Sequence, residues 1–200
     1  MNILDFLPLA SFALFVILIM GKTIILKNKG VAVSSKTKKS ALEKYLLYPV
    51  FILIIFLFIF ELIKPALKIK YSVLPEFITQ NLFNFISLKV SGATLITISL
   101  IFLALTLHDF NKSLRFGLNS KNLGELITTG VFSISRNPFF ISIILYFLGI
   151  AFVYPSPFFI GFTTLTIISI HFFVLKEEKF LQKNYGKEYE NYAKNVRRYF

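Results

Sequence analysis

The stretch PFFISIILYFLGIAFVYPSPFFIGFTTLTIISIHFFVL, residues 138–175, decides the fold of this chain. Two apolar runs, residues 139–154 and 158–175, lie on either side of the turn Tyr154-Pro155-Ser156-Pro157. Proline lacks an N–H and biases the preceding residue away from the helix, so the two runs are predicted to be separate helices. We expect an antiparallel membrane hairpin, whose first helix is short, about 24 Å at 1.5 Å per residue.

The chain as a whole has the composition of an integral membrane protein. Its 200 residues are 56% hydrophobic and include 25 Phe, with a mean hydropathy of +0.71. A soluble domain of this size could not bury so much apolar surface. Apolar runs predict five spans, at residues 4–26, 45–63, 86–107, 139–154 and 158–175. We therefore expect an all-α, polytopic membrane helical bundle that forms a single domain over residues 1–200.

The chain offers no evident metal site. It contains no Cys, which excludes disulfides, thiolate catalysis and thiolate ligands. Its two histidines, His108 and His171, are far apart and have no ligand-like spacing. We expect no metal.

The net charge of +12 is concentrated in the connecting segments. Lysines in loops between apolar spans favour anionic lipid headgroups over nucleic acid as the partner. By the positive-inside rule, residues 22–44, 111–136 and 176–200, which hold 18 of the 22 Lys and Arg, are cytoplasmic. The sequence thus predicts an outside N-terminus and a cytoplasmic C-terminus. The Lys-, Ile-, Asn- and Phe-rich composition suggests a bacterial cytoplasmic membrane.

Residues 123–138 form a polar segment before the hairpin. Two Gly, two Thr, two Ser and a Pro predict a loop rather than a continuous helix. Pro138 is suited to begin the next helix, and Gly130 allows close approach of a ligand to the backbone. Arg136 has a planar guanidinium suited to the carboxylate of a small zwitterion. The alternative is that Arg136 pairs with a lipid phosphate or a neighbouring acid.

Glu177 and Glu178 directly follow the fifth span. Adjacent residues on a helix point about 100° apart, so one carboxylate could face the bundle and hold an ammonium group while the other faces out. The alternative is a solvated helix end. From Lys179 onward, an aromatic and apolar periodicity interrupted at Gly186 predicts an amphipathic cytoplasmic helix, or two. We expect a hydrogen-bonded structural role for His171.

Several of these motifs occur in an order that resembles the isoprenylcysteine carboxyl methyltransferase family and the related membrane phospholipid methyltransferases. The resemblance covers residues 111–200, close to half of the chain. The matching segments are Leu126-Ile127-Thr128-Thr129-Gly130-Val131-Phe132, Arg136-Asn137-Pro138-Phe139-Phe140, Glu177-Glu178-Lys179-Phe180-Leu181 and Tyr185-Gly186-Lys187-Glu188-Tyr189-Glu190-Asn191-Tyr192.

The resemblance implies that residues 111–200 form the half that binds S-adenosylmethionine. It places Glu177 where the family has the acid that lines the cofactor, and it implies catalytic roles for Arg136, Glu177 and Glu178. The positions that it implies for cofactor contact are Glu125, Leu126, Ile127, Gly130, Phe132, Asn137, Pro138, Phe139, Phe140 and Glu177.

Three departures from the family pattern bear on the substrate. Asn137 replaces the commoner His, and Phe132 and Phe140 replace Tyr, which removes two hydroxyls. Phe173 occupies the position of an Arg that serves the substrate carboxylate in prenylcysteine enzymes, which argues against a prenylcysteine acceptor. We expect methyl transfer to some lipid-like or isoprenoid-type amphiphile. If the acceptor is an amine or thiol, His108 or Glu178 are the candidate bases.

Two other functions remain open from the sequence. Sterol reductases share a similar C-terminal end, although they are longer and have more spans. A non-enzymatic membrane protein could also keep the fold without turnover. The methyl acceptor and the oligomeric state cannot be derived from the sequence.

Overall fold

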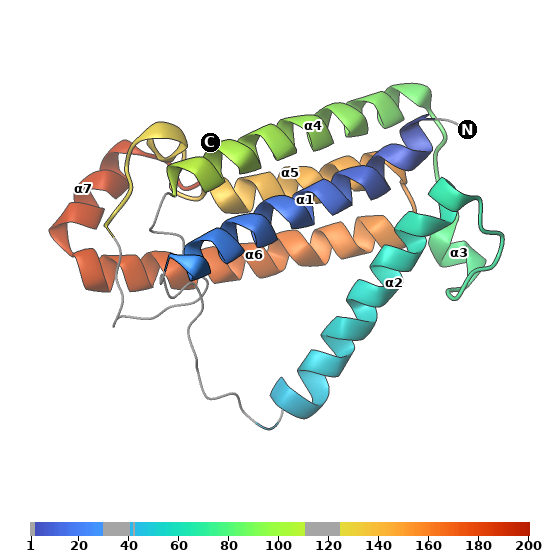
Figure 1. The fold of residues 1–200 in the computed structure, drawn as a ribbon, viewed down its shortest axis with the longest axis horizontal. Helices are drawn as coiled ribbons and strands as arrows, with labels where there is room; N and C mark the ends of the chain where they lie inside the picture. Colours follow the sequence, from blue (N-terminus) through green and yellow to red (C-terminus); the bar gives the residue numbers. More distant parts are fainter. Residues whose placement is uncertain (1–2, 30–40, 42, 111–124) are drawn as a thin grey trace.

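The computed structural model describes residues 3–29, 41, 43–110 and 125–200, and this part of the chain is helical with short connections (Figure 1). The elements are α1 (Ile3–Asn28), a turn of π-helix η1 (Glu43–Leu47), α2 (Tyr48–Leu67), α3 (Glu76–Thr79), α4 (Ile86–Asp109), a 3₁₀ turn η3 (Gly130–Ser133), α5 (Pro138–Val153), α6 (Pro157–Tyr185) and α7 (Lys187–Asn195).

The predicted polytopic helical bundle is confirmed. Four helices, α1, α2, α4 and α6, are long and apolar enough to cross a membrane, and α5 is a shorter apolar helix of 16 residues. The expected hairpin is present, because α5 ends at Val153 and α6 begins at Pro157. Residues 179–185, predicted to start a separate amphipathic helix, instead continue α6. The interruption falls at Gly186 as expected, and its positive φ of 53° breaks the helix there before α7 begins.

The short helix α5 lies at the centre of the bundle, where it packs most extensively against α4 and also contacts α1 and α6 (Figure 1). Half of its residues are buried. Two glycines allow the backbones of α4 and α5 to approach closely. A Cβ on Gly92 would lie 2.6 Å from the carbonyl oxygen of Gly149, and a Cβ on Gly149 would lie 2.7 Å from Cγ1 of Ile96. Small residues at such crossings are typical of membrane helix pairs.

Polar groups inside the bundle are satisfied by neighbouring helices. The hydroxyl of Tyr146 on α5 lies 3.2 Å from Oγ of Ser11 and donates to the carbonyl of Pro8 on α1 at 3.3 Å. The hydroxyl of Ser99 on α4 donates to the carbonyl of Ser142 on α5 at 2.7 Å. Because unsatisfied polar groups are costly in a bilayer, these bonds help to fix α1 and α4 on α5.

Helix α2 diverges from the bundle along its first half (Figure 1). Its buried residues begin only at Phe58, whose ring stacks on Phe162 of α6 with the centroids 4.5 Å apart. Phe12 of α1 and Phe147 of α5 also contact the Phe58 ring. The second half of α2 is thus held to the bundle by an aromatic cluster.

One end of the bundle gathers the segments that the sequence identified as functional. The end of α4, the loop of residues 125–137, the start of α5, the second half of α6, α7 and the C-terminal tail of residues 196–200 all meet there (Figure 1). We refer to it as the site end.

The close α4–α5 contact predicts a stability difference between two glycine substitutions. Gly149→Ala should lower the free energy of unfolding by about 1–3 kcal/mol, because the new methyl group overpacks a helix contact. Gly161→Ala on α6 should leave stability unchanged or slightly higher, because no described atom beyond its chain neighbours and the nearby backbone of α6 lies within 4 Å of its added Cβ. Thermal unfolding in detergent measures both, and equal midpoints for the two variants would contradict the close packing.

Candidate functional site

The loop before α5 has the conformation that its composition predicts. Residues 125–128 are irregular, η3 follows, and Pro138 is the first residue of α5 with Asn137 as its N-cap. Leu123 and Gly124 lie outside the described residues. Both Ser135 and Asn137 are buried although they are polar, so their hydrogen bonds decide how the site end is built.

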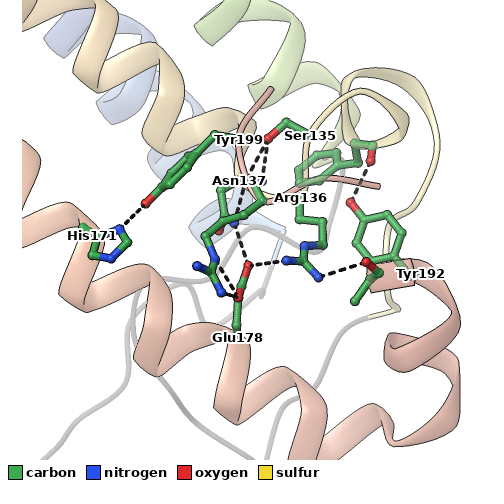
Figure 2. Close-up of polar contacts among 10 residues, drawn as sticks. Ser135, Arg136, Asn137, His171, Glu178, Tyr192 and Tyr199 are labelled. Atoms are coloured by element: carbon green, nitrogen blue, oxygen red, sulfur yellow. Dashed lines mark hydrogen bonds and ion pairs between the residues drawn. The ribbon is translucent and has the colours of Figure 1, made fainter. Parts of the chain in front are cut away.

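The carboxylate of Glu178 is the centre of these bonds (Figure 2). Its Oε1 lies 3.2 Å from Nη2 of Arg136 and accepts from Nδ2 of Asn137 at 3.3 Å. Its Oε2 lies 2.8 Å from Nη2 of Arg198 and accepts from Nε of Arg198 at 3.0 Å. The side chains of Glu178 and Arg136 are only 11% and 13% exposed, so this pairing is more than a surface contact. We call Ser135, Arg136, Asn137, Glu178 and Arg198 the Glu178 cluster.

The C-terminal tail is bound to the loop by its backbone as well. Oγ of Ser135 donates to the carbonyl of Arg198 at 3.0 Å, and Nδ2 of Asn137 donates to the same oxygen at 3.1 Å. The backbone N–H of Arg136 donates to the carbonyl of Arg197 at 3.0 Å. The cluster therefore joins three segments that are distant in sequence: the loop, α6 and the tail.

Arg136 has a neighbouring acid as its partner, which is the alternative that the sequence left open. Its Nη1 also donates to the carbonyl of Ala193 at 3.4 Å, and its guanidinium lies 6.0 Å from the centre of the Tyr189 ring. Two buried polar atoms here have no partner in the described part of the chain, Nε of Arg136 and the hydroxyl of Tyr189. A catalytic or ligand-binding role for Arg136 stays a prediction.

Glu177 lies beside the cluster but outside its network. It follows the apolar part of α6, which ends at Leu175, and its side chain is half-buried. No hydrogen bond or ion pair reaches its carboxylate from the described residues. Burial, and then the negative charge of Glu178, raise the pKa of Glu177 to about 7. Such a carboxyl is suited to accept a cationic group.

The same charged groups shift the pKa of the Tyr189 phenol. Burial and the negative charge of Glu178 are the main causes that raise the pKa of Tyr189 to about 12, and Glu177 adds a smaller effect. Arg136 and Arg198 act in the opposite direction.

A group does approach the backbone closely at Gly130, but this group is a side chain of the protein, that of Asp109. Oδ2 of Asp109 accepts from the backbone N–H of Val131 at 2.8 Å, and Oδ1 lies 3.2 Å from Nδ1 of His108. The Val131 bond, and then the His108 bond, lower the pKa of Asp109. A Cβ on Gly130 would collide with the Asp109 carboxylate, and the φ of Gly130 is +63°. Asp109 thereby fixes the loop to the end of α4.

A row of aromatic rings borders the polar groups. Phe132 packs on Phe110 with centroids 4.9 Å apart, Phe110 lies 6.4 Å from Phe139, and Phe139 lies 5.6 Å from Phe140. The row ends at Phe173 on α6, 5.5 Å from Phe140. The apolar side chain of Phe173 thus lies against α5, at the position where the resemblance would have an Arg.

The predicted cofactor positions are brought together only in part. Asn137, Pro138 and Phe132 are buried at the loop–α5 junction, and Phe139 and Phe140 follow on α5. Leu126 and Ile127 are half-buried. Glu125 is exposed and forms no hydrogen bond within the described segments. Cofactor contact by any of these residues remains a prediction.

The two histidines have different surroundings. His108 is 87% exposed at the end of α4, beside Asp109. His171 is hydrogen-bonded, as expected, with its Nδ1 3.1 Å from the hydroxyl of Tyr199 in the tail (Figure 2). Its side chain is exposed on the outside of the bundle rather than buried between helices.

Sequence reasoning missed Arg198, Ser135 and Asp109 as a cap, and it included Tyr189 and Tyr192 only as members of a matching segment, without a contact for either. Tyr192 is buried and donates its hydroxyl hydrogen to the carbonyl of Phe132 at 2.7 Å. The basic pair Arg197-Arg198 at the end of the chain was the one available signal for the tail. Nothing in the local pattern of Ser135 distinguishes it from other loop serines.

The comparison with protein families shows to which family this chain belongs. A model of the phospholipid methyltransferase family matches residues 87–188, just over half of the chain. The chain belongs to the phospholipid methyltransferase family. The match covers α4 to the start of α7 and ends before Arg198. Among curated proteins and among solved structures nothing matches. Membership in this family implies a membrane methyltransferase.

The contact between Gly130 and Asp109 predicts non-additive effects on stability. Gly130→Ala should cost more than the roughly 1–2 kcal/mol of a left-handed L-residue, because its methyl group displaces the Asp109 carboxylate from Val131. In an Asp109→Ala background the same substitution should cost only that conformational part. Unfolding of the four proteins in detergent measures the coupling, and fully additive effects would contradict the proposed cap.

Proposed function

We propose that this protein transfers a methyl group from S-adenosylmethionine to a lipid-like amphiphile, at a site formed by the Glu178 cluster, Glu177 and the aromatic row. The single observation that carries the proposal is Glu177, a half-buried carboxyl without a partner in the described residues, beside a cluster whose charges are already paired. Family membership supports the reaction type.

The unpaired polar groups fit the amino-acid part of the cofactor. Glu177 would accept the ammonium group, and Nε of Arg136 is a buried donor that remains free for the carboxylate. The hydroxyl of Tyr189 is a second buried group without a partner in the described chain. A zwitterion supplies the complementary charges for these groups.

Positioning and exclusion of water are the catalytic contributions that we assign to the protein. When bound, S-adenosylmethionine supplies a methyl group that its sulfonium has already activated. Phe132, Phe139 and Phe140 would form an apolar wall whose ring faces attract a cation and keep water away. The Glu178 cluster would hold the loop and the tail in one arrangement, so that donor and acceptor meet in a fixed geometry.

The geometry also bears on the candidate bases. Both oxygens of Glu178 are already engaged by guanidinium groups, which argues against proton abstraction by this residue. His108 is exposed, and within the described residues only its Nδ1 has a partner, so it is the better placed of the two if the acceptor is an amine or a thiol. A carboxylate acceptor would need no base.

The proposal predicts that S-adenosylhomocysteine binds the detergent-purified protein and that Glu177→Gln weakens binding. Loss of a charged hydrogen-bond partner worth about 1.5–3 kcal/mol corresponds to a factor of roughly 10–150 in affinity. Calorimetric titration measures it. Glu188→Gln, which removes an exposed acid on α7, is the matched control and should bind like the wild type.

The pH dependence of the same titration provides a second readout. Only ionised Glu177 would hold the ammonium group, and its pKa is about 7 in the free protein. A proton therefore competes with the ligand below that value, and affinity should fall about tenfold from pH 8 to pH 6 in the wild type but not in Glu177→Gln. A folded wild type that binds no S-adenosylhomocysteine would overturn the proposal, and nicotinamide binding would favour a reductase.

A further inference from the structure

A groove of about 490 Å³ lies between α5 and α6 on the outside of the bundle. Its walls are apolar along most of its length, and two polar side chains lie at one end. The lining residues are Ile144, Ile167, Ile168, His171, Phe172 and Tyr199. The volume falls within the range of roughly 300–1,000 Å³ that is usual for small-molecule sites.

The polar end of the groove retains hydrogen-bonding capacity. Nδ1 of His171 and the hydroxyl of Tyr199 lie 3.1 Å apart, so each satisfies one valence of the other (Figure 2). In the part of the chain that the structure describes, Nε2 of the imidazole has no partner and the phenol oxygen keeps a lone pair. A ligand head group in the groove could engage both.

The same end is connected to the Glu178 cluster by two elements. Along α6, His171 precedes Glu178 by seven residues, which places both on one face of the helix about 10.5 Å apart. Along the tail, Tyr199 directly follows Arg198, whose guanidinium pairs with Glu178. The groove therefore leads along the bundle surface toward the proposed methyl-donor site.

We propose that this groove binds the hydrocarbon chain of the methyl acceptor, a single-chain amphiphile whose polar group hydrogen-bonds to His171 and Tyr199. This proposal rests on the proposed function and specifies its substrate class. The four apolar side chains match one slender chain, and among the described residues no Lys or Arg lines the groove to neutralise an anionic head group.

A tryptophan reporter can test the occupant, because the chain contains no Trp. Phe172→Trp places the reporter in the groove, and Leu165→Trp places it on the same helix, 66% exposed before substitution and outside the groove. Each variant is reconstituted in discs of unlabelled phosphatidylcholine. Each is then titrated with a single-chain alkyl alcohol that carries bromine at mid-chain and quenches on contact.

Quenching at position 172 should be saturable, and quenching at position 165 should rise linearly with the fraction of brominated alcohol. In the Phe172→Trp protein, adding His171→Phe should raise the half-saturating fraction about fivefold, as expected for one lost hydrogen bond. His171→Gln should largely preserve it, and Tyr199→Phe should reproduce the loss if His171→Phe does not fold.

Three results would overturn the proposal. These are linear quenching at both positions, equally effective quenching at position 172 by a two-chain brominated phosphatidylcholine, and saturation that is indifferent to His171→Phe and Tyr199→Phe. The first two would make the groove an ordinary lipid contact. Titration of the same Phe172→Trp protein with S-adenosylhomocysteine separates this proposal from the proposed function. If S-adenosylhomocysteine does not bind, that result counts against the proposed function and not against saturable binding of the alkyl chain.

Discussion

The pairing of one largely buried carboxylate, that of Glu178, is the constraint on which the rest of the site end depends. A largely buried carboxylate on α6 would be costly without compensation, and Arg136, Asn137 and Arg198 provide it from the loop and the tail. Removing one partner of such a pair typically costs about 3–5 kcal/mol, far more than a surface ion pair. The loop, α6 and the tail are therefore positioned by one set of charges, and Asp109 adds the end of α4 through Val131.

This arrangement separates the roles of the two adjacent acids. Glu178 is saturated by protein groups, whereas Glu177, one residue earlier and about 100° around the helix, is left without one in the described chain. The fixed negative charge of Glu178 adds to burial in raising the pKa of Glu177. Glu178 is thus suited to hold the structure, and Glu177 is suited to a cationic ligand. The same cluster ties the tail down, so that Tyr199 reaches His171 at the edge of the α5–α6 groove.

Sequence reasoning located the helices and the motifs but not their pairing. Apolar run length predicts α4, α5 and the hairpin turn well, because it depends on local composition alone. Which glutamate meets Arg136 depends on the rotation of α6 against α5, which no local pattern encodes. The partner of Gly130 is 21 residues earlier in the chain, so no local pattern shows its contact with Asp109, and ligand contact at Gly130 stays a prediction. The role of Arg198 could not be predicted, because it depends on the tail folding back over the loop. Helix α6 runs past its predicted end because residues 176–185 favour a helix whether or not they lie in the membrane.

Hydrogen exchange at the backbone amide of Arg136 tests the central claim most directly. This N–H donates to the carbonyl of Arg197, so it reports whether the tail is held on the loop. In Glu178→Gln the account predicts faster exchange at Arg136 while the amide of Ile141, bonded within the first turn of α5, stays protected. In Glu177→Gln both amides should exchange as in the wild type. Equal exchange at Arg136 in the wild type and Glu178→Gln would contradict the structural role of Glu178.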